Sequence, residues 1–558
     1  MNGLLRKVLL FVLVMAVVAG AGWFGRKAYK KHRERSLVAE ARASMEKKDF
    51  RTAWLCLQRA LQINALSVPA SAAMADLLET AGLPAALGWR IRTAQLEPAN
   101  MKRRFEWAEA ALRLRELKSA DQALSGVKDA ETNSAAYHKL AGALAWAAHN
   151  RPEAASHYSE ALRLEPTNAV IEVNLATIHL VSTNPATVQA ARVALQGMAR
   201  TNTALRTVAL KDLAEEAEAR KDWPDAIAYS KELRQVPSAP FRDKLGHLRL
   251  LREATNAEFG PYSVQLRNEA AKDPAEAFLY GEWCAAAEGP TNALRWLQSL
   301  PASVRTNQPV PLVVTDCQIA LKDWRGILET IAKAQWGEGQ YYHMALESLA
   351  QKSLGQAQAA AQAWQRALKA SAHRLDRLSR LAQVTKAWGW EPEMTAVLVQ
   401  TTSDFPKEKW ASDALVAAYY QAGNTHAMAE LIEKCYNANP SDNRLKNNLA
   451  SVSLLRTSNL DRAHRFAREA YESATNNPFF ASTYAYSLLL QNKKVEAAQI
   501  VSQIKTNYLQ IPSVALYYGV VKASAGHKEA AKEALRRADG APLLPEEKEI
   551  LRLAKAKL

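Results

Sequence analysis

The sequence has few of the residues that interrupt helices or cross-link a chain. Glycine and proline number 22 each among 558 residues, about 8% together, where about 12% is usual. Because alanine is abundant and both helix breakers are scarce, the composition favours helix throughout. Only four cysteines occur, far apart and without a C-x-x-C pair, which excludes a disulfide-dense scaffold and leaves a zinc site unsupported. They are Cys56, Cys284, Cys317 and Cys435. We expect Cys284 and Cys435 to be core thiols.

Motifs that carry chemistry are also missing. The sequence contains no G-x-G-x-x-G and no G-x-x-x-x-G-K-[ST], so the lone Gly337-Glu338-Gly339 lacks the backbone that would cradle a phosphate. The eleven histidines include no H-E-x-x-H, and we expect His138, His149 and His157 on different helix faces. We therefore predict no catalytic, cofactor-binding or metal-binding residues, and a protein that is not an enzyme.

Long apolar runs are equally rare, and a single one occurs, at residues 8–25. As a helix it would span about 27 Å, close to the hydrocarbon core of about 30 Å. Two interpretations stay open: a signal peptide cleaved at Ala19-Gly20-Ala21, or an uncleaved transmembrane helix. Six basic residues lie directly after the run within 26–35, whereas two precede it. This asymmetry favours an anchor with the bulk of the chain in the cytoplasm, with the periplasm as the alternative.

The distribution of charge also indicates contact with a membrane surface. The net charge is +16, of which residues 1–35 contribute +7, from eight basic side chains and one acid. Basic residues concentrated beside an apolar run indicate anionic lipid headgroups, so we expect no nucleic-acid partner. Within the run, Ala16/Gly20 and Ala21/Gly25 have a spacing typical of self-associating helices, and equally of small-residue composition.

A repeat of about 34 residues extends through the chain. Ser451, Ala485 and Gly519 are 34 apart, and a second small residue occurs 12 positions after each of them. Fifteen such units fit between residues 36 and 540. Alanine holds the second small position in ten of them: Ala53, Ala86, Ala120, Ala154, Ala226, Ala293, Ala360, Ala463, Ala497 and Ala531. The pattern predicts two short helices per unit, which cross closely where both side chains are small. A local signature recurs before the second helix, as in Lys48-Asp49-Phe50, Lys221-Asp222-Trp223 and Lys322-Asp323-Trp324.

The fourth unit, whose first small position is Gly142, closely resembles the tetratricopeptide repeat (TPR) family. It has Gly142, Ala154, Tyr158, Ala161 and Pro166 at the small, aromatic and proline positions of the family pattern. The resemblance implies an all-α fold, a right-handed α-α solenoid of about fifteen TPR helix pairs preceded by one transmembrane helix. It also implies peptide binding on the concave face lined by the first helix of each pair. Two units depart from the pattern, around residues 182–197 and 254–262.

The expected organisation has five parts. Residues 1–7 form a short basic tail, 8–25 the membrane helix or signal anchor, 26–35 a basic juxtamembrane segment, 36–540 the repeat array and 541–558 a helix that caps its end. This layout is similar to that of the bacterial lipopolysaccharide-assembly regulators, although the paired C-x-x-C metal domain of that family is missing. We expect a single-pass protein of the bacterial inner membrane.

These features predict a membrane-anchored scaffold that binds protein or peptide partners. The alternative is an exported envelope-assembly factor or a non-catalytic subunit of an enzyme complex. The register places six residues on the inner face of the C-terminal units, as a candidate peptide groove: Trp410, Tyr420, Asn448, Phe479, Tyr486 and Tyr517. The competing interpretation is that these rings pack between successive first helices and belong to the core.

Overall fold

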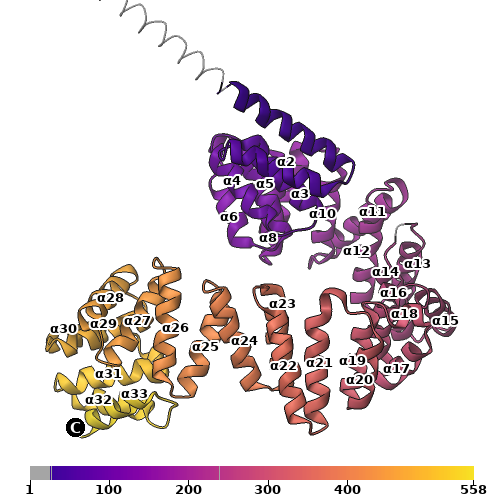
Figure 1. Ribbon diagram of the computed structural model, residues 1–558. Helices are drawn as coiled ribbons and strands as arrows, with labels where there is room; N and C mark the ends of the chain where they lie inside the picture. The colour runs from indigo at the N-terminus through magenta and orange to yellow at the C-terminus, as the bar shows by residue number, and fades with distance from the viewer. Residues whose placement is uncertain (1–25, 27, 238) are drawn as a thin grey trace, which may run out of the picture. The chain divides into compact units, whose positions relative to one another are not determined.

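The computed structural model describes residue 26, residues 28–237 and residues 239–558 (Figure 1). Most of these described residues are helical, and none of them belongs to a strand. The chain divides into two compact units, Met1–Leu266 and Arg267–Leu558. The apolar run at 8–25 lies outside the described residues. Among the helices that are described, none has the length and hydropathy needed to cross a bilayer.

Thirty of the described helices succeed one another as fifteen pairs, joined by short turns. We call the first helix of each pair its A helix and the second its B helix. In the first unit the pairs are 28–46 with α2 (Phe50–Ile63), α3 (Val68–Thr80) with α4 (Ala86–Leu96), α5 (Met101–Arg113) with α6 (Leu117–Ser125), α8 (Ala135–Ala147) with α9 (Arg151–Leu164), α10 (Ala169–Leu180) with α11 (Pro185–Thr201), α12 (Arg206–Ala219) with α13 (Trp223–Arg234), and α14 (Phe241–Glu253) with α15 (Phe259–Ala270). The division between the two units falls within α15.

The second unit continues the same arrangement. Its pairs are α16 (Pro274–Glu288) with α17 (Pro290–Ser299), α19 (Val310–Ala320) with α20 (Trp324–Lys333), α21 (Gln340–Ser353) with α22 (Ala357–Ser371), α23 (Leu375–Trp388) with α24 (Glu391–Asp404), α25 (Lys409–Gln421) with α26 (Thr425–Ala438), α27 (Asn443–Leu455) with α28 (Leu460–Ser473), α29 (Pro478–Leu490) with α30 (Lys494–Ser502), and α31 (Pro512–Ser524) with α32 (Lys528–Ala538). Four short elements lie between pairs: the helices α7 (Asp129–Thr132) and α18 (Ala302–Arg305), and 3-10 turns at Gly337–Gly339 and Thr506–Gln510. Helix α33 (Pro545–Lys555) comes after the last pair. The predicted α-solenoid of helix pairs is confirmed.

The small residues lie where the two helices of a pair cross. All ten alanines at the second small position are at most 4% exposed. Glycine at the first position permits an even closer approach. A Cβ on Gly142 would come within 2.8 Å of the Tyr158 ring, and one on Gly519 within 2.7 Å of Leu535. A larger side chain at these crossings would force the two helices apart, which is why the sequence pattern is strict there.

The Lys-Asp-aromatic signature makes the turn between the two helices of a pair. Lys48, Lys221 and Lys322 adopt left-handed backbone conformations, with φ of 59°, 59° and 57°. The aspartate after each lysine is the N-cap of the B helix, and its carboxylate accepts a hydrogen bond from a backbone N–H of the first turn. The signature therefore stops one helix and begins the next within three residues.

The predicted crossings of the C-terminal pairs can be tested at Ala497. This residue is fully buried in α30, in a cluster that contains Ala485, Leu488 and Val521. We expect Ala497→Leu to lower the free energy of unfolding of the C-terminal pairs by about 1–3 kcal/mol, because the crossing has no room for the larger side chain. Gln499→Leu, on the exposed side of the same helix, is the matched control. Hydrogen exchange during urea unfolding should localise the loss to α29–α32, because repeat stability depends on nearest neighbours. Identical unfolding of the two variants would contradict the register.

Candidate functional site

The six residues predicted for a peptide groove lie on the A helices of the last four pairs. Trp410 and Tyr420 belong to α25, Asn448 to α27, Phe479 and Tyr486 to α29, and Tyr517 to α31. A cavity of about 180 Å³ brings four of them together, with lining from Tyr420, Asn448, Phe479 and Tyr517. Trp410 and Tyr486 do not line it. We refer to the A-helix surface that carries these four lining residues as the inner face.

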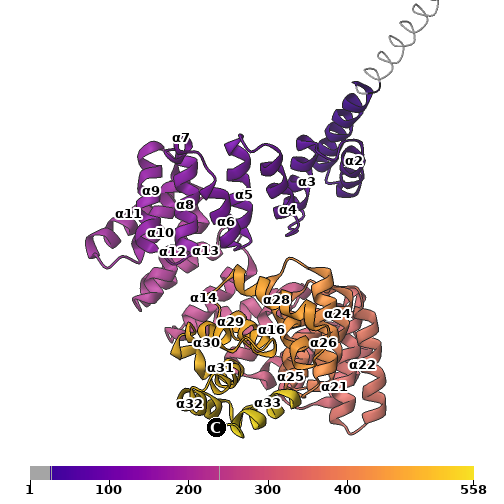
Figure 2. The same cartoon turned by 90° about the vertical axis from the view of Figure 1, so that its left-hand side faces the viewer.

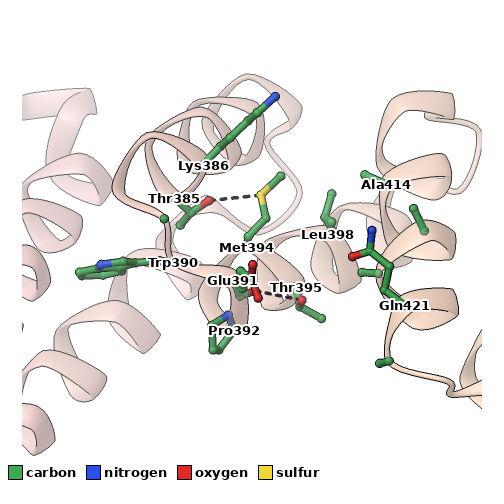
Figure 3. Close-up of a pocket in the computed structure, with 14 residues that line it drawn as sticks. Thr385, Lys386, Trp390, Glu391, Pro392, Met394, Thr395, Leu398, Ala414 and Gln421 are labelled. Carbon is green, nitrogen blue, oxygen red and sulfur yellow. Dashed lines mark hydrogen bonds between the residues drawn. The ribbon is translucent and has the colours of Figure 1, made fainter. Parts of the chain in front are cut away.

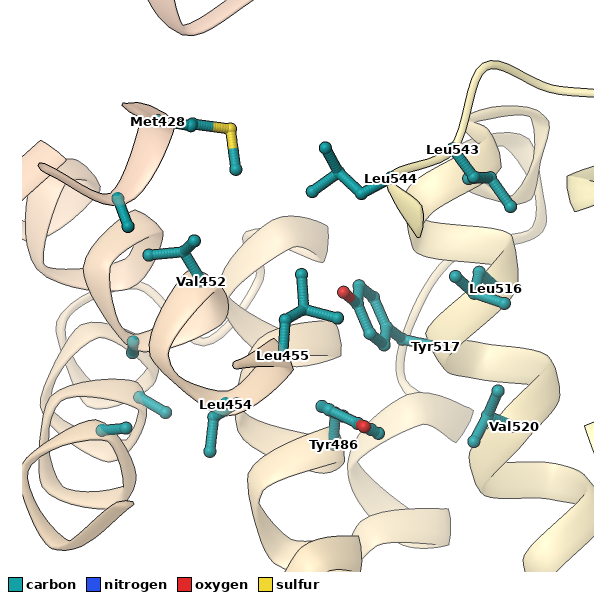
Figure 4. Packing of buried hydrophobic residues seen from close by; sticks show 14 of the residues in the cluster. Met428, Val452, Leu454, Leu455, Tyr486, Leu516, Tyr517, Val520, Leu543 and Leu544 are labelled. Carbon is teal, nitrogen blue, oxygen red and sulfur yellow. The ribbon is translucent and has the colours of Figure 1, made fainter. Parts of the chain in front are cut away.

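Two of the predicted rings are core residues. Tyr486 and Tyr517 are buried, and their ring centroids are 5.0 Å apart at 44°. Figure 4 shows both rings in one cluster with Leu455 and Val520. Burial raises the pKa of Tyr486 to about 12. The competing interpretation, packing between successive A helices, therefore describes this pair.

Two other aromatic residues of the predicted groove, Trp410 and Phe479, are exposed, at 38% and 46%. Phe479 lines the cavity from the first turn of α29. Asn477 caps that helix by accepting hydrogen bonds from the N–H groups of Phe479 and Phe480. The cap fixes the first turn, and with it the position of the exposed Phe479 ring.

The C-terminal segment reaches into the inner face, which the sequence analysis did not foresee. Figure 4 shows Leu543 and Leu544, which precede α33, in the same cluster as Tyr517 and Leu455. Glu547, in the first turn of α33, is only 2% exposed. Its Oε2 atom accepts hydrogen bonds from the Tyr420 hydroxyl at 2.5 Å and from the Leu544 N–H at 3.0 Å, and its Oε1 atom accepts one from the Tyr517 hydroxyl at 3.1 Å.

The same segment contacts the turn between α25 and α26. The Thr425 hydroxyl donates a hydrogen bond to Glu546 at 2.6 Å. The Pro545 ring lies over Gly423, where a Cβ would be 3.5 Å from Pro545 Cδ. Gly423 has φ of +66°, a left-handed conformation that favours glycine. The segment thus bridges α25 and α31, the first and the fourth of the four A helices that carry the predicted groove residues.

The electrostatics of the site are unusual for a buried acid. Within the described part of the chain, no Lys or Arg nitrogen lies within 4.0 Å of the Glu547 carboxylate; its polar contacts are the two tyrosine hydroxyls and the backbone N–H. A buried carboxylate is tolerated only where donors satisfy its oxygens. Burial, and after it the charge of Glu547, raises the pKa of both Tyr420 and Tyr517, so the two phenols stay protonated and donate.

The cavity beside Glu547 is also lined by a residue with an unused hydrogen-bond acceptor. Asn447 is 4% exposed, and its Nδ2 atom donates to Asn448 Oδ1 at 3.4 Å. Its Oδ1 atom is buried and accepts no hydrogen bond from the described residues. The lining includes further hydroxyl groups, from Ser451, Ser482, Thr483 and Ser513. A ligand that donates a hydrogen bond would satisfy the Asn447 oxygen.

A larger cavity, of about 840 Å³, opens between α24 and α25 (Figure 3). Met394 and Leu398 lie on one side, and Ala414 and Gln421 on the other. None of the six predicted residues lines it. The hydroxyls of Thr385 and Thr395 are already engaged, that of Thr385 with helix carbonyls and the Met394 sulfur and that of Thr395 with the Glu391 carbonyl. We therefore place the candidate site at the smaller cavity, where polar and aromatic groups converge.

One sequence prediction about histidine is wrong. His138 and His157 face each other across α8 and α9, with their Nδ1 atoms 2.9 Å apart. They are 19 residues apart, a separation that spans the turn of the helix pair and so brings them to one crossing. Among the described residues, no group of three or more His, Cys, Asp or Glu side chains could hold a metal ion.

The cysteines agree with the prediction made for the core. All four are buried and free, Cys284 and Cys435 among them. Burial raises the pKa of the Cys284 thiol to about 12 and that of Cys317 to about 11. Both thiols are therefore protonated near neutral pH and poor nucleophiles.

Comparison with known proteins adds little detail. No family model matches the chain, and no curated protein sequence matches it. Among solved structures, one described as a functional characterization of Pseudomonas aeruginosa pilF is similar at 15% identity with a TM-score of 0.32, over 40% of this chain and 99% of that one. The APC/C hetero-tetramer Cut9-Hcn1 is similar at 13% identity and 0.29, over 94% and 96%. A tetratricopeptide repeat protein from Parabacteroides merdae is similar at 16% and 0.26, over 44% and 97%. The assignment to a TPR-like α-solenoid rests on the helix pairs of this chain itself.

Two aromatic residues of α29 allow the structural and the binding roles to be separated. We expect Tyr486→Ala to lower the free energy of unfolding by about 3–5 kcal/mol, because it leaves a large cavity in the core. Phe479→Ala, near the start of the same helix, should change it by less than about 0.5 kcal/mol, because this ring is half exposed. Equilibrium unfolding in urea measures both. Equal destabilisation by the two substitutions would mean that Phe479 is also a core residue and is not available to a partner.

Proposed function

We propose that the protein is a membrane-tethered scaffold that holds protein or peptide partners on its inner face and carries no chemistry of its own. The observation that carries the proposal is the convergence of Tyr420, Asn448, Phe479 and Tyr517 on one cavity, from four successive A helices. A row of this kind combines an exposed apolar ring with buried polar groups, as recognition of an extended peptide requires.

The tether is the second part of the proposal. The apolar run at 8–25 has the length of a membrane span. Residues 28–35 continue as the exposed start of the first A helix, so their basic side chains are free to meet lipid headgroups. Fixing a scaffold at the bilayer raises the effective concentration of whatever it holds there.

The binding part is tested by comparing the proteins that two variants capture. We expect the double variant Phe479→Ala, Asn448→Ala to lose partners that the full-length wild-type protein retains from solubilised membranes. Its helix content should match wild type, and its free energy of unfolding should fall by about 1–3 kcal/mol at most, because the buried Asn447 Nδ2 loses its acceptor. Quantitative mass spectrometry of the captured proteins provides the measurement.

Val495→Ala is the matched control for this comparison. Val495 is 72% exposed on the B helix α30, away from the inner face. Its variant should keep every partner. If the inner-face variant captures the same proteins as wild type in the same amounts, the binding surface lies elsewhere on the array.

The topology is tested with two fusions at the C-terminus. We expect a green fluorescent protein fusion to be fluorescent and to fractionate with membranes, and an alkaline phosphatase fusion to be inactive, because the basic residues at 26–35 oppose export of the repeat array C-terminal to them. Active phosphatase on a membrane-bound fusion would reverse the orientation. Active phosphatase in a soluble, shortened product would favour the alternative, an exported envelope-assembly factor or a non-catalytic subunit of an enzyme complex.

A further inference from the structure

The inner face is already occupied by part of the same chain. Residues 543–547 place two leucine side chains and a glutamate carboxylate on it, and a proline ring beside it on the turn between α25 and α26. The contacts join residues that are far apart in the sequence, since Tyr420 and Glu547 are separated by 127 positions. Leu543, Leu544 and Glu547 are 4%, 1% and 2% exposed, so the two leucines and the acid are as buried as core residues.

We propose that residues 543–547 are a resident ligand, and that the inner face recognises partner peptides of the same chemistry. Such a peptide carries adjacent bulky aliphatic residues with a glutamate three positions after the second of them, whose carboxylate replaces that of Glu547 between Tyr420 and Tyr517. Binding then requires release of the resident segment, which makes the C-terminus a competitive regulator. This inference rests on the proposed function, because it names the partner class and the control of the same face.

The hydrogen bonds at Glu547 select for a carboxylate. Two phenol hydroxyls from A helices of different pairs point at one acid, and neither phenol is held by a basic side chain in the described residues. A hydrogen bond to a charged acceptor is stronger than one to a neutral acceptor. If the acid leaves, both hydroxyls lose this acceptor, and the Tyr517 side chain is buried, so the face favours any segment that returns one.

The apolar contacts define the residues that precede the acid. Leu544 belongs to the cluster that contains Met428, Val452 and Leu455, from α26 and α27. Pro545 packs on the turn at Gly423, and its ring fixes the backbone angle at the start of α33. The aliphatic and acidic anchors are therefore held at a set spacing by one rigid turn.

The resident segment does not use all of the available contacts. The cavity of about 180 Å³ remains beside Glu547, and the Oδ1 atom of the buried Asn447 has no donor among the described residues. A partner peptide with a hydrogen-bond donor at this position gains a contact that the resident segment lacks. That difference allows a partner to displace a segment that has the advantage of being tethered.

Release of residues 543–547 does not require loss of the whole helix. Farther along α33, Leu551 and Ala554 are buried with Leu535 and Ala538 of the last B helix. Lys555 also forms an ion pair with Asp539 at 2.8 Å. This ion pair belongs to the second half of α33 and involves none of the residues that line the inner-face cavity.

The experiment uses the full-length protein in detergent and two fluorescein-labelled peptides. The first has the sequence of residues 541–555, and the second has alanine in place of its second glutamate, which corresponds to Glu547. Fluorescence anisotropy compares their binding to wild type, to Glu547→Ala, and to the double variant Leu544→Ser, Glu547→Ala. Glu549→Ala is the matched control, because Glu549 is exposed on the same helix and pairs with Arg552.

We expect the first peptide to bind Glu547→Ala at least about tenfold more tightly than wild type, since removing a charged hydrogen-bond acceptor weakens the resident segment by that order. The double variant should bind it more tightly still, and Glu549→Ala should match wild type. The second peptide should bind every protein at least about tenfold more weakly than the first, because it lacks the same acceptor. Hydrogen exchange should rise in residues 541–548 of the variants and stay unchanged in α21–α24.

Equal affinity of the first peptide for wild type and the double variant would overturn the proposal, as would no binding to the double variant, or equal binding of the two peptides. The proposed function is judged separately, by the captured partners that depend on Phe479 and Asn448. Loss of those partners together with failure of both peptides would leave the scaffold in place and remove the resident-ligand assignment.

Discussion

The close crossing of the two helices in each pair is the constraint on which the rest of the structure depends. Alanine or glycine at the crossing lets the backbones approach until side chains such as Tyr158 and Leu535 fill the remaining space. A pair formed in this way cannot bury its own apolar face, so it must stack on the next pair. Stacking aligns the A helices side by side, and that alignment is what allows residues of four different helices to line one cavity.

At the C-terminal end, the row of A helices curves enough for one carboxylate to join its first and fourth members. Packed helices lie about 8–10 Å apart, so four of them in a flat row would place the outer two about 24–30 Å apart. Glu547 nevertheless accepts hydrogen bonds from Tyr420 in α25 and from Tyr517 in α31. The buried acid therefore stabilises the curved arrangement, and its cost in desolvation is offset by three donors rather than by a counter-charge.

The sequence predicted local structure well and distant contacts poorly, for a physical reason. The spacing of small residues identifies helix pairs because each crossing involves residues only 12 positions apart, and the ten alanines lie where this spacing requires. The same register assigned six residues to A helices but could not tell the exposed Phe479 from the buried Tyr486. Whether a side chain on an A helix is buried depends on the angle between its pair and the next pair, which the spacing does not specify. Contacts between Glu547 and Tyr420 depend on rotation accumulated over four pairs. The adjacent Leu543 and Leu544, directly before a helix-starting proline, were the signal that could have indicated a buried segment.

An array of stacked pairs leaves the last one without a neighbour, and here the C-terminal segment meets that need in two ways. Leu551 and Ala554 cover apolar side chains of α32, as a terminal element of a solenoid must. Leu543, Leu544 and Glu547 instead reach the inner face, where Glu547 accepts hydrogen bonds from Tyr420 and Tyr517. The ion pair of Lys555 with Asp539 belongs only to the second half of the segment, and the hydrogen bonds of Glu547 belong only to the first. Release of Glu547 therefore removes the hydrogen bonds that join α25 to α31, and a partner's carboxylate at the same position restores them.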